Sequence, residues 1–189
     1  KAGAAVGLIA NKGKVSVDAA TAGKKALVQG AGDATISTSL TSGGTATITA
    51  GSLVKVASVK STGANVVVSG ADADVTSAIA DNDLSITATA GDATLDTGTA
   101  NGTALVKATG NATVTTSLIS GNTATLDSGN IAKALLIKST AGNVEIDGNS
   151  IAVRTASAFG NRDATASAGH SKLGPAAAGA APTRVSSTR

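Results

Sequence analysis

One segment of this chain occurs twice, and the two copies start 78 residues apart. Residues 32–51, GDATISTSLTSGGTATITAG, return as residues 110–129, GNATVTTSLISGNTATLDSG. When residues 32–70 are laid over residues 110–148 without a gap, 19 of 39 positions are identical. A fixed internal period is typical of repeat architectures, in which each unit buries its apolar face against the next unit. We therefore expect an array of similar units.

Most of the chain alternates between apolar and polar residues, as in NDLSITATA and TATIT. A period of two predicts strands rather than helices. The two copies of the repeat support this interpretation, because Val66 and Val68 stay apolar in the second copy whereas Val67 between them becomes Glu145. Position 67 is therefore expected to face water.

Short stretches rich in Gly, Asn and Asp, among them GAGD, TGAN, ADND and AGN, separate the expected strands every eight to twelve residues. These residue types tolerate the backbone conformations of tight turns. Turn anchors follow one another at spacings of 19 or 21 residues, and four such units make up the 78-residue repeat. The anchors are Gly13, Gly32, Leu53, Asp72, Gly91, Gly110, Ile131 and Ser150.

This spacing predicts an all-β fold, a parallel β-helix (β-solenoid) of about eight coils of 19–21 residues. The solenoid is expected over residues 1–172, with its super-repeat at 32–109 and 110–172. Residues 173–189 are rich in Ala, contain both prolines and are expected to form a linker or tail. A sandwich of antiparallel hairpins would also have short strands and frequent turns, but it does not predict a gapless internal copy.

The composition suits the narrow interior of such a coil and excludes several functions. The chain has no Cys, Met, Trp or Tyr, one Phe, and no Pro before Pro175. Without Cys, disulfides and Cys-based zinc sites are excluded. A net charge of only +3, scattered and without stacking aromatics, argues against nucleic-acid binding. No apolar run is long enough to span a membrane. Since the sequence starts without Met or a signal segment, we expect a piece of a longer protein.

Successive units open with GDATI, GDATL, GNATV and GNVEI and are rich in Gly, Asp, Asn, Thr, Ala and Val. In this style of repeat, residues 10–160 resemble the shaft of the filamentous haemagglutinin family, secreted exoproteins of Gram-negative bacteria. The resemblance implies a right-handed coil, export through an outer-membrane two-partner-secretion transporter, and a place at the cell surface. It also implies a role in adhesion, biofilm formation or toxin delivery.

The residues that could carry chemistry are few. Phe159 is expected to plug the end of the apolar stack rather than to contact a ligand. His170 precedes Ser171 in AGHSKLG, which lacks the last glycine of a nucleophile elbow, so a solvated surface histidine is expected. QGAGDAT lacks the third glycine of a dinucleotide site and is expected to be a turn. We therefore expect no catalytic residue, cofactor or metal, and no enzymatic activity.

Aspartates in the turns raise the question of calcium, because carboxylates on successive coils can gather around a cation. The alternative is that each carboxylate caps a turn. Asp33 becomes Asn111 in the second copy, which favours the turn role. The aspartates considered are Asp33, Asp72, Asp74, Asp81, Asp83 and Asp92.

Two lysines of VKVASVKST recur in AKALLIKST, four coils along. Lys55, Lys60, Lys133 and Lys138 would then mark one side of the solenoid, with the two pairs about 19 Å apart. They are candidate contacts for a sulfated or otherwise anionic glycan. The alternative is that outward lysines keep exposed strands soluble and prevent edge pairing.

Thr-x-Thr pairs resemble the flat faces of ice-binding solenoids, but ordinary outward threonines in strands explain them as well. The pairs are Thr45 and Thr47, Thr87 and Thr89, Thr113 and Thr115, and Thr123 and Thr125.

The sequence thus favours a non-enzymatic shaft segment of a secreted adhesin or filament. The alternatives are a solenoid module that binds anionic glycan or ice, and the stalk of a contact-dependent toxin-delivery protein. The apolar start of the chain, with Val6, Leu8 and Ile9, is expected to belong to a preceding coil. Solenoid ends with unpaired strands are templates for further pairing, so end-to-end association is also expected.

Overall fold

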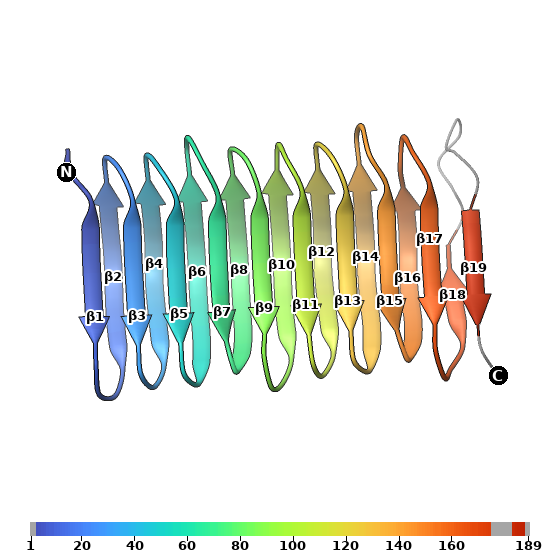
Figure 1. The fold of residues 1–189 in the computed structure, drawn as a ribbon, viewed down its shortest axis with the longest axis horizontal. Helices are drawn as coiled ribbons and strands as arrows, with labels where there is room; N and C mark the ends of the chain where they lie inside the picture. Colours follow the sequence, from blue (N-terminus) through green and yellow to red (C-terminus); the bar gives the residue numbers. More distant parts are fainter. Residues whose placement is uncertain (1–2, 175–182, 188–189) are drawn as a thin grey trace.

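The computed structural model describes residues 3–174 and 183–187, and the regular elements in these residues are all β-strands (Figure 1). The strands form two parallel sheets, one of ten strands and one of nine. The ten-stranded sheet contains β1 (Val6–Ala10), β3 (Ala26–Gly30), β5 (Ala46–Ala50), β7 (Val66–Gly70), β9 (Leu84–Ala88), β11 (Ala104–Ala108), β13 (Ala124–Ser128), β15 (Val144–Gly148), β17 (Arg162–Ala166) and β19 (Thr183–Ser187). The nine-stranded sheet contains β2 (Val15–Ala22), β4 (Ala34–Ser42), β6 (Leu53–Ser61), β8 (Asp72–Ala80), β10 (Ala93–Ala100), β12 (Ala112–Ser120), β14 (Ile131–Ser139), β16 (Ser150–Ser157) and β18 (Ser171–Leu173).

Each coil consists of one strand from each sheet, so β1 and β2 form the first coil and β17 and β18 form the ninth. The prediction of an all-β parallel solenoid is confirmed, with nine coils where about eight were expected. In Figure 1 the strands nearer to the viewer run downward and those behind run upward while the chain advances from left to right. The coil is therefore right-handed, as is usual for connections between parallel strands.

The interior is a set of straight rows that run from coil to coil. In the ten-stranded sheet, Val28 pairs in register with Ile48, and Ile48 with Val68. All three side chains are fully buried, and the row continues through Ile86, Val106, Leu126 and Ile146. Aligned rows of aliphatic side chains pack without the space that a large aromatic ring needs. This explains why Ala, Val, Ile and Leu suffice for the core.

The strands of the nine-stranded sheet bend in the middle. In β6, Val56 and Val59 are both buried, and the two residues between them are half-buried instead of alternating in and out. In β4 the corresponding buried pair is Ile36 and Leu40, one residue further apart, and the register between β4 and β6 shifts at this point. The same extra residue occurs in β12, the copy of β4. The bend therefore follows the super-repeat.

Four of the buried serines form two pairs that follow the repeat, Ser42 with Ser120 and Ser61 with Ser139. Ser61 is buried; its hydroxyl donates to the carbonyl of Gly44 at 2.7 Å and accepts the N–H of Ala64. Its copy Ser139 bonds in the same way to the carbonyl of Asn122 and the N–H of Gly142. Because each buried hydroxyl both donates and accepts a hydrogen bond, the corner between the two sheets closes without an unsatisfied hydroxyl at these two positions.

Phe159 does not plug the stack, and this prediction is wrong. The side chain lies in the turn between β16 and β17 and is 76% exposed. In this turn Ala158 takes the inward position and is buried, while Phe159 next to it faces outward. At the start of β17 the inward position next to Val144 is taken by Arg162, which is buried and donates to the carbonyl of Ala156 at 3.4 Å.

The two termini also differ in part from expectation. Residues 183–187, placed in the expected tail, form β19 and pair in parallel with β17, while residues 175–182 lie outside the described part of the chain. At the other end, β1 belongs to the solenoid, and Val6 and Leu8 pack against the core as expected. Ile9 instead faces outward and is 56% exposed, because it alternates with Leu8 along the strand.

Candidate functional site

A groove of about 660 Å³ opens on the nine-stranded sheet where the strands bend. Its floor is formed by Val114, Ala134 and Val153, which occupy the same inward row of β12, β14 and β16. In each strand the residues just before and just after the floor residue point outward. They form the two walls of the groove, and the floor residue lies between them. The groove therefore crosses successive coils rather than following one strand.

Three cations line this groove, and we call the site the basic groove: Lys133, Arg154 and Lys172 with the floor just described. Lys133 and Lys172 stand in one outward row, separated by Ala152, while Arg154 directly follows Val153 and lies at the bend itself. All three side chains are exposed. Within the described residues none of them has an ion-pair partner. Strands β12, β14, β16 and β18 contain no Asp or Glu. The groove is therefore uniformly positive.

The four lysines predicted from the sequence lie on the outer face of the nine-stranded sheet, Lys55 and Lys60 in β6 and Lys133 and Lys138 in β14. Their equivalence is confirmed, because register pairing leads from each lysine of β6 to its copy in β14. The structure does not gather them into one site. Asp74, Thr94 and Thr113 stand between Lys55 and Lys133, and the Lys55 ammonium lies 3.9 Å from Asp74.

Only Lys133 of that set lines the groove; Arg154 and Lys172 were not predicted. A signal for Lys172 exists in the sequence, since it lies two coils beyond Lys133 in the same row. The signal for Arg154 is weaker, because its position depends on the bend, which the alternation of residues does not reveal.

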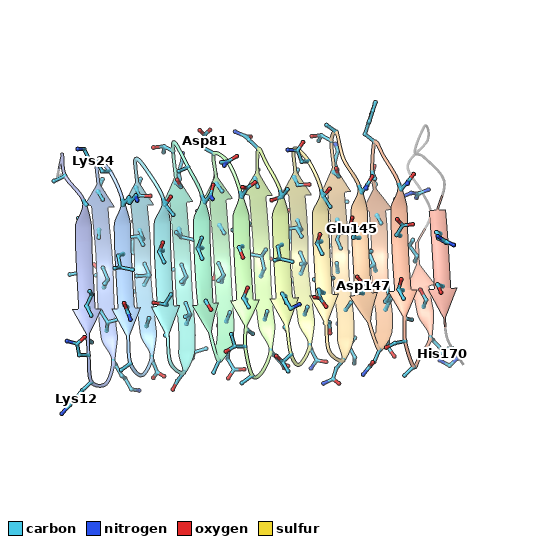
Figure 2. All side chains as sticks on the ribbon, viewed as in Figure 1. Lys12, Lys24, Asp81, Glu145, Asp147 and His170 are labelled. Carbon is cyan, nitrogen blue, oxygen red and sulfur yellow. The ribbon has the colours of Figure 1, made fainter. Side chains whose placement is uncertain are left out.

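The opposite face of the same coils is acidic. Asp127 of β13, Glu145 and Asp147 of β15, and Asp163 of β17 project from the ten-stranded sheet, and we call them the acidic strip. Asp127 is in register with Asp147, and Glu145 with Asp163, so like charges lie on neighbouring strands. Figure 2 shows Glu145 and Asp147 on the face nearest to the viewer.

Counter-charges lie at both ends of the acidic strip. On one side the ammonium of Lys107 lies 2.6 Å from Asp127, which raises the pKa of Lys107 through this hydrogen bond and the attraction of the carboxylate. On the other side Arg184 is in register with Asp163. Neither Glu145 nor Asp147 has an ion-pair partner within the part of the chain that the structure describes.

Turn aspartates bond to the backbone of the next coil. Asp33 accepts the N–H of Leu53 at 3.4 Å, and its copy Asn111 accepts the N–H of Ile131 at 3.3 Å. Asp92 likewise accepts the N–H of Asn111 at 2.7 Å. An amide oxygen replaces a carboxylate oxygen in this role, so the exchange of Asp for Asn preserves the bond. No group of three His, Asp or Glu side chains in residues 3–174 and 183–187 is arranged to hold a metal ion.

Two carboxylates have a shifted pKa. Hydrogen bonds from Thr116 and then Thr115 lower the pKa of Asp96, which lies at the bend of β10. The Lys14 ammonium, 2.7 Å away, and the N–H of Leu53 lower the pKa of Asp33. Each bond stabilises the ionised form, so it contributes to stability above the usual carboxyl pKa and is lost as the pH falls through the lowered value.

We expect Asp96→Asn to make the solenoid less sensitive to acid. The wild-type protein should lose this stability only as the pH falls below the ordinary carboxyl pKa of about 4, because the unfolded chain is protonated there first and folded Asp96 follows at its lowered pKa. The variant has no carboxylate to protonate there, and its urea midpoint should fall less over the same range. Urea titrations at several pH values measure the difference. Parallel pH profiles for the two proteins would contradict the assigned role of Asp96.

The remaining candidate residues form no site. His170 is exposed near the start of β18, as expected, and Figure 2 shows it at the corner of the coil. The threonine pairs do not stack on one another: Thr47 has Leu27 and Val67 as its neighbours, and Thr125 has Leu105 and Glu145. The flat array of threonines found on ice-binding faces is therefore missing around these two residues.

Within the described residues there is no helix that could cross a membrane. Comparison of the chain with protein-family models, with curated proteins and with solved structures found no match.

Proposed function

We propose that this chain is a non-enzymatic structural shaft of a secreted bacterial surface adhesin or filament, with a role in cell adhesion or biofilm formation. One observation supports it above the others: a single apolar interior runs through nine coils with no break. Each added coil lengthens the molecule by about 4.8 Å while repeating the same contacts. Such a structure holds its ends apart at a fixed distance.

The turn bonds support the same proposal. Asn65, Asp83 and Asn143 each accept a backbone N–H from the following coil, so side chains reinforce the backbone ladder at the corners. A stiff spacer benefits from this, because its length then depends on many equivalent bonds. The repeat style described above adds the secreted setting and a two-partner-secretion transporter as the export partner. A stalk for toxin delivery would use the same shaft.

The proposal is tested on intact cells of the source organism. Antibodies against the purified chain should label unbroken cells, and brief protease treatment should remove the label while a cytoplasmic marker stays intact. Removing the gene should weaken attachment of the cells to a surface or to one another. Labelling that requires cell lysis would overturn the proposal.

A further inference from the structure

We propose that copies of this chain associate side by side, with the basic groove of one copy against the acidic strip of the next. The two surfaces belong to opposite sheets of the same three coils. The seventh coil carries Lys133, the eighth Arg154 and the ninth Lys172 on one face. On the other face the same coils carry Asp127, then Glu145 and Asp147, then Asp163.

The two surfaces have the same repeat along the axis. In both sheets neighbouring strands are about 4.8 Å apart, so one cation per coil faces one or two carboxylates per coil. Two copies with parallel axes can therefore bring three cations opposite three coils of carboxylates without bending either solenoid. Complementary charge of this kind favours one register and suppresses others.

Each surface is also incomplete by itself. Asp127 next to Asp147 and Glu145 next to Asp163 are like-charged pairs in register, an arrangement that destabilises a sheet. The basic groove adds an apolar floor and the exposed side chain of Leu135 to its cations. A partner that brings carboxylates on a strand surface would pair the cations and cover this floor.

A second copy fits these features better than other occupants. A linear polyanion would pair the cations but would leave the acidic strip as it is, whereas a copy of the chain presents both charges at the matching repeat. Since the two surfaces differ, the contact is heterologous and does not close on itself. It extends into a row of parallel solenoids.

The first test uses charge reversal. At low ionic strength, about 0.02 M, the weight-average mass of the wild-type protein should rise at least about twofold with concentration, and at about 0.5 M salt it should return to the monomer value. A groove variant, with Lys133→Glu, Arg154→Glu and Lys172→Glu, and a strip variant, with Glu145→Lys, Asp147→Lys and Asp163→Lys, should each remain monomeric. Mixing the two variants should restore association.

A matched control reverses three exposed lysines in the turns that flank β2, away from both surfaces, and should associate like the wild type; these are Lys12, Lys24 and Lys25. Circular dichroism checks that all variants keep their β structure. Three results would overturn the proposal: a wild-type monomer at low salt, association of the two variants separately, or a control that is monomeric. Retention of a monomeric wild type on a sulfated-polysaccharide resin, lost in the groove variant, would assign the groove to an anionic glycan instead.

The second test locates the contact directly, because the chain has no cysteine of its own. Ala152→Cys places a thiol between Lys133 and Lys172, and Thr165→Cys places one beside Asp147. Mixed under mild oxidation, these variants should form the cross-linked heterodimer faster than either forms a homodimer. Thr87→Cys, on the same outward row as Thr165 but four coils away, is the control partner. Equal cross-linking of Ala152→Cys to both partners would show that the contact is not the proposed one.

Discussion

Ile48→Asp should abolish folding of the coils around β5, whereas Thr47→Asp should leave the protein folded. Ile48 is fully buried in the central row, between Val28 and Val68. Removing its side chain alone costs about 2–5 kcal/mol, and burying an unpaired carboxylate adds several kcal/mol more. The sum is comparable to the total stability of about 5–15 kcal/mol that is usual for a domain.

Thr47 precedes Ile48 in the same strand and faces outward, so an added charge there stays in water and should change stability by about 0.5 kcal/mol or less. Hydrogen exchange distinguishes the two variants strand by strand. In Ile48→Asp, protection should be lost in β3, β5 and β7 and should be kept best in β13, since solenoid coils contact only their neighbours. Full protection around β5 would contradict the assignment of this row to the core.

Deletion of residues 32–109 should give a shorter solenoid that is still folded. The deletion joins Ala31 to Gly110, so β3 is followed directly by β12. In the full chain β3 is followed by β4, and β12 is the copy of β4 in the second repeat. Register is kept because the removed segment is one complete super-repeat. The shortened protein should lose four coils, about 19 Å of its length, and keep a cooperative unfolding transition.

A matched control deletes residues 32–99 instead. In this variant the next complete strand after β3 is β11, which belongs to the same sheet. No strand of the nine-stranded sheet remains between them to complete the coil. We expect this variant to be insoluble or to unfold without cooperativity. Small-angle scattering and thermal unfolding compare the two deletions. Similar behaviour of both proteins would mean that the 78-residue period is not what sets the register.

Much of the fold could be predicted because inward and outward residues alternate and the duplicated segment repeats the alternation. Position 67 is an example: Val67 and its copy Glu145 both lie on the outer face of their strands, as predicted. The bend of the nine-stranded sheet could not be predicted in this way. Val56 and Val59 both face inward although they are three positions apart, which breaks the period of two. In the sequence alone, such a break cannot be distinguished from an irregular residue in a straight strand.

The candidate site was predicted less well than the fold. Comparison of the two repeats finds Lys133, because its counterpart Lys55 is also a lysine. Arg154 and Lys172 correspond to Thr76 and Thr94 in the first copy, so comparison of the two copies selects neither, and only the spacing of the coils from Lys133 indicates Lys172. Charge separation between the two faces depends on which sheet each strand joins, so it emerges only when the coil is assembled. The exposure of Phe159 does not follow from its hydrophobicity, because the turn places Ala158 inward and Phe159 outward.

The direction of the backbone hydrogen bonds has a mechanical consequence. Strands in both sheets cross the long axis, so the bonds between coils point along that axis (Figure 1). A pulling force on the two ends therefore stretches these bonds directly, and the outermost coil yields first because it is bonded to a neighbour on one side only. When that coil detaches, a segment such as the one between Ala34 and Val54 is freed and can extend to about 65 Å, compared with the 4.8 Å it spanned when folded. The molecule should thus yield one coil at a time, absorbing work at each step while the coils behind it stay intact.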